Sequence, residues 1–168
     1  CHQADSAMYI AKKQGGNSYR FYDSAIEDEA NKRSALLYGL DSALSKREFF
    51  LLYQPIVESR THRLAGVEAL VRWQAEGQWP AGPSSFIPLL EETNKIVEIG
   101  AWVLMRACRD YQSLLENGVM DEEGVMSVNV SPRQLLAPGF VELVAHVLEV
   151  SELDPACLQL EITENLQC

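Results

Sequence analysis

Short segments with the periodicity of strands alternate with helical segments through the second half of the chain. The runs 125–130 and 158–164 are short and apolar, and a helical segment precedes each of them. Because strands that alternate with helices form parallel sheets covered by helices, this order predicts an α/β fold. With two earlier strands the count reaches four, half the number in a closed (β/α)8 barrel of about 250 residues.

The two earlier strands are predicted to run antiparallel. The apolar runs 49–57 and 64–73 flank a polar turn at 58–63, which is typical of a hairpin. Beyond the second run, Ser84 and Ser85 are predicted to cap the next helix.

The clearest periodicity in the chain predicts a long helix before the third strand. Its apolar residues step by three and four positions, as one face of a helix does: Val97, Ala101, Leu104, Cys108, Tyr111 and Leu115. This stripe places Cys108 in a core, and Gly118 is predicted to end the helix. A second helix, 133–150, is predicted to be interrupted at Pro138 and Gly139.

The first third of the chain is predicted to belong to a different domain from the rest, followed by a linker. Residues 2–14 fit a short helix and 19–22 a short strand, and 24–47 fit a charged amphipathic helix linking two domains. The chain begins in mid-pattern with Cys1, which we interpret as a truncated start.

Composition narrows the class of protein. The chain has 168 residues, 47% of them hydrophobic, and a net charge of -10. This charge opposes a nucleic-acid surface, which needs a basic stripe, but allows a small anionic ligand held by a few cations. We expect a cytoplasmic protein with free thiols, since no secretory leader, membrane-spanning stretch or CxxC pair is present.

Polar residues share one face of the second strand. Alternation places Glu68, Leu70 and Arg72 on the same side. The functional interpretation gives Glu68 a metal ion and Arg72 a phosphate, and the alternative is a structural ion pair between them.

The third and fourth strands carry further oxygen ligands. Asn129 lies at the carboxyl end of its strand, where barrel enzymes place their sites, and Glu161 interrupts an apolar strand. Taken singly, Asn129 could serve only to turn the chain, and Glu161 and Glu164 could be salt-bridged or rim residues. Together with Glu68, the residues Asn129 and Glu161 suit Mg²⁺ or Mn²⁺ and metal-assisted hydrolysis of a phosphodiester.

Other chemistries have no comparable pattern. The three histidines, His2, His62 and His146, lie in unrelated contexts, so no Ser-His-Asp or Cys-His arrangement is indicated. No dinucleotide-binding or P-loop glycine motif is present.

The segment from about Leu40 to Asn165 resembles the N-terminal half of an EAL domain. Five motifs occur in the family's order: Tyr53-Gln54-Pro55-Ile56, Glu68-Ala69-Leu70-Val71-Arg72-Trp73, Phe86-Ile87-Pro88, Asn129-Val130-Ser131 and Glu161-Ile162-Thr163-Glu164. Residues 4–22 resemble the last helix and strand of a GGDEF domain. The resemblance implies a GGDEF tail at 1–23, a linker helix at 24–47 and half an EAL domain at 48–168.

For the fold, the resemblance implies part of a TIM-type barrel with an antiparallel first strand. For the activity, it implies hydrolysis of cyclic di-GMP to pGpG with Mg²⁺ or Mn²⁺. Glu68, Asn129 and Glu161 match metal ligands, and Gln54, Leu70 and Arg72 match substrate contacts. Glu68 and Glu164 match catalytic positions, the latter steadying a later loop.

The family's paired aspartates and its catalytic lysine have no counterpart, because no Asp-Asp pair occurs and Lys95 is the last lysine. We therefore expect the chain alone to be inactive. The alternatives are a non-catalytic module that binds cyclic di-GMP or a protein, and a diguanylate cyclase, of which only a tail would be present. The resemblance also allows dimerisation, and membrane attachment of a longer parent protein through other segments.

Overall fold

The computed structural model describes residues 24–75 and 81–162, and the chain divides into two compact units, 1–42 and 43–168. The helix α2 spans Ser24–Ala43 and ends four residues earlier than predicted. The helix and strand predicted within 1–23 lie outside the described residues. No described helix combines the length and apolar character needed to cross a bilayer.

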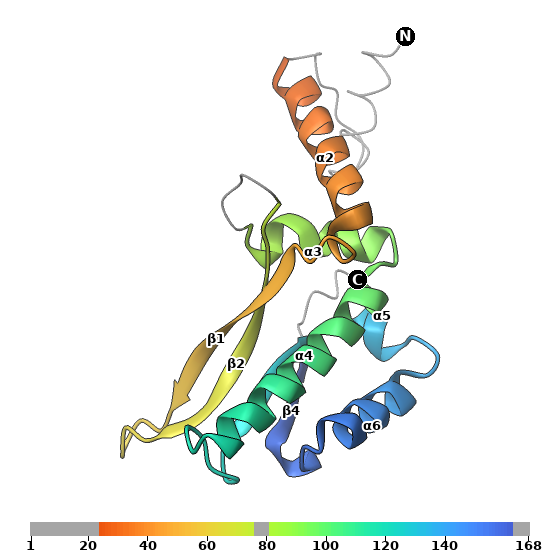
Figure 1. The fold of residues 1–168 in the computed structure, drawn as a ribbon. Helices are drawn as coiled ribbons and strands as arrows, with labels where there is room; N and C mark the ends of the chain where they lie inside the picture. The colour runs from red at the N-terminus through yellow and green to blue at the C-terminus, as the bar shows by residue number, and fades with distance from the viewer. Residues whose placement is uncertain (1–23, 76–80, 163–168) are drawn as a thin grey trace. The chain divides into compact units, whose positions relative to one another are not determined.

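The second unit is built on an open, mixed sheet of four strands in the order β1-β2-β3-β4 (Figure 1). Its strands are β1 (Phe49–Val57), β2 (Leu64–Trp73), β3 (Val125–Val130) and β4 (Leu158–Ile162). The first pair is antiparallel and the other two pairs are parallel, which confirms the predicted hairpin, the α/β class and the strand order.

The helical layer contains two helices where the sequence predicted one. Pro83–Glu92 forms α3 and Ile96–Glu116 forms α4. Asn94 separates them in a left-handed conformation with φ of 59°. The predicted serine caps of α3 were wrong, because Gly82 is the N-cap and α3 begins at Pro83, whose fixed φ suits a first helical position.

The buried face of α4 matches the predicted stripe only in part, because Val97, Ala101 and Leu115 are half-buried. Leu104, Cys108 and Tyr111 are buried as expected, and so are Ile96, Ile99, Gly100, Val103 and Ala107. The extra burial follows from contacts of α4 with both β3 and α6 (Phe140–Ser151). Gly118 ends the helix as predicted, since its φ of 66° allows the backbone bonds from Gly118 to Leu115 and from Val119 to Leu114.

The predicted interruption of the helix at 133–150 is confirmed. The single turn α5 (Pro132–Leu135) is followed by α6, and Gly139 before α6 has a φ of 81°. A 3-10 turn, η1 (Pro155–Cys157), then leads into β4.

Aromatic rings join β1 and β2 to the helices at one end of the sheet. Phe49 lies with its ring centroid 6.4 Å from Trp73, 5.8 Å from Phe86 and 6.3 Å from Trp102. The Trp73 indole also donates a 2.9 Å hydrogen bond to the Glu48 carboxylate. Trp73, at the carboxyl end of β2, is therefore packed against Phe49 of β1 and against Phe86 of α3, whose ring centroid lies 6.1 Å away.

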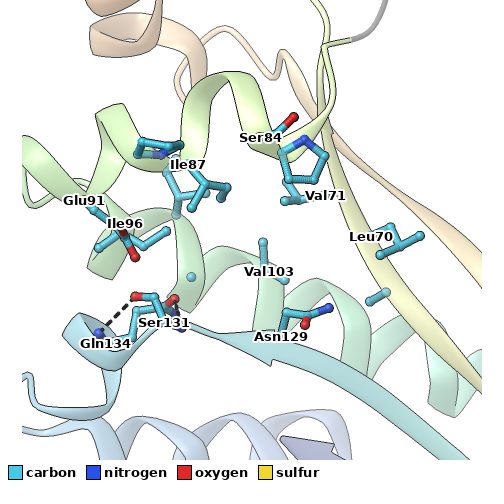
Figure 2. A pocket seen from close by; sticks show the side chains of 15 residues that line it. Leu70, Val71, Ser84, Ile87, Glu91, Ile96, Val103, Asn129, Ser131 and Gln134 are labelled. Atoms are coloured by element: carbon cyan, nitrogen blue, oxygen red, sulfur yellow. Dashed lines mark hydrogen bonds between the residues drawn. The ribbon is translucent and has the colours of Figure 1, made fainter. Parts of the chain in front are cut away.

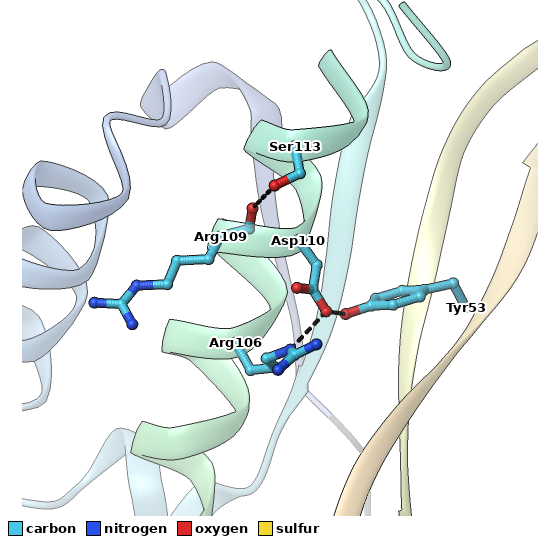
Figure 3. Close-up of polar contacts among 5 residues, drawn as sticks. All are labelled: Tyr53, Arg106, Arg109, Asp110 and Ser113. Carbon is cyan, nitrogen blue, oxygen red and sulfur yellow. Dashed lines mark hydrogen bonds and ion pairs between the residues drawn. The ribbon is translucent and has the colours of Figure 1, made fainter. Parts of the chain in front are cut away.

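A polar contact joins β1 to α4 further along the sheet (Figure 3). The Tyr53 hydroxyl donates a 2.5 Å hydrogen bond to Asp110, which also pairs with Arg106 at 2.8 Å. Burial, and then the bond to the Asp110 carboxylate, raises the pKa of Tyr53 above its usual value. The phenol is thus held in its neutral, donating form.

Candidate functional site

A row of polar side chains crosses the sheet on one face. Gln54 is the register partner of Glu68, Glu68 pairs with Ser127, and Ser127 pairs with Gln159. Partners in register project from the same face, so all four strands contribute one polar residue to this row. The opposite face carries the apolar residues of β2 and β3 that form the core: Val67, Ala69, Trp73, Met126, Val128 and Val130.

Asn129 and Glu68 are joined directly. The Asn129 side-chain nitrogen donates a 2.6 Å hydrogen bond to Oε1 of Glu68. The nitrogen must be the donor here, because an ionised carboxylate only accepts. The amide oxygen of Asn129 and the second oxygen of Glu68 are not used in this bond.

Glu161 joins the same face from β4. It is the register partner of Asn129, and its Oε1 accepts bonds of 2.6 Å from the Ser127 hydroxyl and 3.3 Å from the Gln159 amide. Ser127 is buried and lies in register between Glu68 and Gln159. Ser127 lies two residues before Asn129, so the alternation of a strand puts it on the same face, but no motif in the sequence marked it as a site residue.

Arg72 contributes positive charge farther along β2. Its guanidinium donates a 2.9 Å hydrogen bond to the Val71 carbonyl. Within the ranges that the structure describes, Arg72 forms no ion pair with Glu68, and no other cation pairs with Glu68 or Glu161. The structural ion pair considered as the alternative is therefore absent between these two described residues.

The donor set suits a hard divalent cation. Glu68, Asn129 and Glu161 offer carboxylate and amide oxygens from three neighbouring strands, and Mg²⁺ and Mn²⁺ prefer such ligands. Among the described residues, no three His, Cys, Asp or Glu side chains gather in one place. Within residues 24–75 and 81–162, the cluster thus consists of two carboxylates and one amide.

Comparison with known families accounts for this geometry. Residues 39–167 match the EAL domain family. The chain belongs to this family.

Two kinds of relative support the assignment of the EAL domain. The bifunctional diguanylate cyclase/cyclic di-GMP phosphodiesterase MucR of Pseudomonas aeruginosa is 41% identical over 162 residues, which are 96% of this chain and 23% of that protein. A solved MucR phosphodiesterase in complex with c-di-GMP is 39% identical, with a TM-score of 0.73 over 77% of this chain and 52% of that one.

A second solved structure, the EAL enzyme Bd1971 with bound cAMP and cyclic di-GMP, is 29% identical, with a TM-score of 0.73 over 82% of this chain and 38% of that one. The chain spans about a quarter of the length of its curated relative MucR.

A pocket of about 380 Å³ opens in the EAL domain where β2 and β3 end (Figure 2). Asn129 and Ser131 line it from β3 and the turn beyond it, and Leu70 lines it from β2. Ile87 and Val103 contribute apolar surface from α3 and α4. One predicted metal ligand and one predicted substrate contact therefore border the same pocket.

The remaining predicted site residues are placed less closely together. Gln54 is exposed and lies beside Glu68 in register, and Arg72 is half-buried near the end of β2. Glu164 lies outside the described residues. The structure thus brings together Glu68 and Asn129 by a direct bond, and Asn129 and Glu161 by register.

Proposed function

We propose that this EAL domain contributes the first part of a cyclic di-GMP phosphodiesterase site, with its sheet as the first four strands of a TIM-type barrel. The observation that carries the proposal is the arrangement of Glu68, Asn129 and Glu161 on one face of three adjacent strands. The similarity to MucR, a bifunctional diguanylate cyclase/cyclic di-GMP phosphodiesterase, and to the solved MucR phosphodiesterase in complex with c-di-GMP supports this proposal.

In this proposal, Glu68, Asn129 and Glu161 hold Mg²⁺ or Mn²⁺. When bound, the ion lowers the pKa of a water molecule and offsets charge on the phosphodiester. Asn129 positions the Glu68 carboxylate through their 2.6 Å bond, and Ser127 positions Glu161 in the same way. Their roles match those of partners that orient metal ligands in other sites.

Arg72, Gln54 and Leu70 would contact the substrate. A guanidinium can bind a phosphate with two parallel hydrogen bonds, and Arg72 lies four residues beyond Glu68 on the same face. Gln54 supplies an amide beside Glu68, and Leu70 offers apolar surface at the pocket. We assign Glu164 its loop-steadying role on the EAL motif alone.

We also propose the domain boundaries: a GGDEF tail at 1–23, a linker helix at 24–47 and EAL residues at 48–168. The match to bifunctional MucR covers 162 residues and so extends beyond 39–167. Because the match to MucR also covers residues before 39, it supports the assignment of a GGDEF tail.

The 168-residue chain alone should not turn over cyclic di-GMP. A two-metal phosphodiesterase holds its ions about 3.5–4 Å apart and needs several carboxylates to offset them. The candidate cluster supplies two, and the sequence contains no Asp-Asp pair for a second ion.

A chimera tests the proposal. Residues 39–167 of this chain replace the matching segment of MucR, and pGpG release is followed by chromatography with Mn²⁺. The chimera should be active and the isolated chain should stay at background. Glu68→Ala should abolish the activity of the chimera, whereas Glu149→Ala, at an exposed position on α6, should retain it.

The outcomes separate the alternatives. A folded chimera that binds cyclic di-GMP without releasing pGpG would favour the non-catalytic module. A chimera that neither binds nor hydrolyses would overturn the proposed function, and turnover by the isolated chain would refute the expected inactivity.

A further inference from the structure

The turn after Asn129 is closed by a reciprocal pair of hydrogen bonds. Ser131 is the N-cap of α5, and its hydroxyl accepts a 3.3 Å bond from the Gln134 backbone nitrogen. The Gln134 side-chain oxygen accepts a 3.1 Å bond from the Ser131 nitrogen in return. This is a capping box, which satisfies two backbone donors at once. Both side chains are buried, with 6% and 5% of their surface exposed.

Gly100 on α4 makes room for this capping box. An ideal Cβ at Gly100 would lie 1.7 Å from Nε2 of Gln134 and 2.5 Å from its Cδ. Atoms cannot approach so closely, so any larger residue at position 100 must displace the Gln134 side chain. A Cβ at position 100 would therefore push on the end of the Gln134 side chain, which is the part that forms the cap.

Displacement of the Gln134 side-chain amide would weaken its bond to the Ser131 nitrogen. Gln134 is held between α4 and the Ser131 turn, and its amide oxygen is the group that bonds to the Ser131 nitrogen. Asn129 lies two residues before Ser131 on the same stretch of backbone, and Figure 2 shows Asn129, Ser131 and Gln134 along one wall of the pocket. Movement of the turn would thus move Asn129 relative to Glu68.

We propose that Gly100 and Gln134 are positioning residues for Asn129. Gln134 fixes the turn that aims the Asn129 amide at Glu68, and Gly100 lets α4 come close enough to hold Gln134. The inference rests on the proposed function insofar as Asn129 is a metal ligand. A purely structural cap would affect stability and leave the Asn129 side chain and the affinity for metal unchanged.

The test uses Gly100→Ala, Gln134→Ala and the double variant in the 168-residue chain. The side-chain amide signals of Asn129 are followed by ¹H–¹⁵N NMR, and their broadening by added Mn²⁺ gives an apparent affinity. Loss of the signals in Asn129→Asp assigns them. Gly82→Ala is the matched control, because a Cβ there meets nothing within 4 Å.

Gly100→Ala should shift the Asn129 amide signals and weaken Mn²⁺ binding about tenfold, as loss of a ligand's supporting partner commonly does. Its stability should also fall, by about 1 kcal/mol for the lost cap, partly offset because alanine favours a helix interior more than glycine does. The double variant should lose less affinity for Mn²⁺ than the sum of the losses in the two single variants. The reason is that the shortened residue at position 134 no longer meets the methyl group added at position 100. Gly82→Ala should leave both readouts unchanged.

Unchanged Asn129 signals in a folded Gly100→Ala chain would overturn the inference, as would additive losses in the double variant. If Gly100→Ala does not fold, Gln134→Ala decides alone, and unshifted Asn129 signals there would refute the role of Gln134. If the unmodified chain shows no Mn²⁺-dependent broadening, the proposed metal site fails. The NMR shifts without Mn²⁺ still test the positioning of Asn129 in that case.

Discussion

The Asn129 side chain donates a hydrogen bond of 2.6 Å to Glu68, 61 positions earlier in the chain and on the neighbouring parallel strand. The Glu68 carboxylate therefore has the neutral Asn129 amide as its hydrogen-bond donor and not a cationic side chain. The bond also holds the amide oxygen of Asn129, a further possible metal ligand, beside the two carboxylate oxygens. The effect of a charge at position 129 follows from this geometry.

Asn129→Asp should destabilise the chain at neutral pH and less so at acidic pH. Two carboxylates in contact disfavour ionisation, so the introduced carboxyl should have a pKa above its usual value of about 3.9. When a group has a higher pKa in the folded chain than in the unfolded chain, the free energy of unfolding is unaffected at a pH below the unfolded-state pKa. It then falls as the pH rises towards and through the folded-state pKa. We expect the free energy of unfolding of Asn129→Asp to fall by about 1–2 kcal/mol at pH 7, which corresponds to a rise of roughly one to two units in the pKa of the new carboxyl.

Urea unfolding at pH 4 and pH 7 measures this difference. Asn31→Asp, at an exposed position on α2, is the matched control and should show no such pH dependence. Added Mn²⁺ should stabilise Asn129→Asp more than the unmodified chain, because a cation relieves the repulsion. Equal stability of Asn129→Asp at the two pH values would contradict the geometry.

Tyr53→Phe should lower the free energy of unfolding by about 1 kcal/mol, the usual net value of one hydrogen bond. The 2.5 Å bond to Asp110 joins β1 to α4, and the variant removes only the donor. Because the pKa of Tyr53 is raised, this contribution is complete below about pH 10 and is lost only as pH rises through the folded value. Chemical denaturation at pH 7 and pH 9 should therefore give the same loss.

Tyr38→Phe is the control, since Tyr38 is 84% exposed on α2. A similar loss of stability in Tyr38→Phe and Tyr53→Phe would show that the contact with Asp110 adds nothing.

Strand positions could be read from the sequence because alternation and burial agree. On β3 the apolar residues Val128 and Val130 are buried on the helix side, while Asn129 faces the polar row. The same alternation located Glu68 and Glu161, so the common face of the candidate ligands follows from two-residue periodicity once the apolar residues of each strand are assigned to the core side. It does not predict which side chains bond to one another.

The missed features depend on close approaches between distant segments. Gly100 and Gln134 meet only because α4 packs against α5, and neither residue interrupts a periodic pattern. The division between α3 and α4 depends on one left-handed residue, Asn94, inside an otherwise helical stretch. Asparagine tolerates this conformation better than most residues, which is a weak signal without the surrounding structure.

Cys108 and Cys157 should resist alkylation in the folded chain. Both are buried and free, and burial raises the pKa of Cys108 to about 11. Burial, with smaller effects of Asp154 and Glu122, also raises the pKa of Cys157. At pH 8 about one thousandth of Cys108 would be thiolate, the reactive form.

Iodoacetamide labelling followed by peptide mass spectrometry measures this resistance. Labelling of both peptides should rise with urea in parallel with unfolding, and the fully denatured chain is the positive control. Rapid labelling of Cys108 without denaturant would show that α4 is not packed as described.

The last prediction concerns β4, which has no partner on its outer side among the described strands. Its apolar face is incompletely covered, with Leu160 36% and Ile162 55% exposed. An exposed apolar edge strand is a template for pairing with another chain, so we expect the 168-residue chain to self-associate as its concentration rises.

Ile162→Lys should reduce this association, because a lysine on the apolar face must be desolvated when a second chain packs there. Gln159→Lys adds the same charge to the same strand on the opposite face and should reduce association less. Light scattering coupled to size-exclusion chromatography, over a range of concentrations, compares the three chains. Both lysines change the net charge from -10 to -9, which by itself weakens repulsion between copies and would favour association. An equal reduction by both lysines would therefore assign the effect to a lysine anywhere on the edge strand and would remove the apolar face of β4 as its cause.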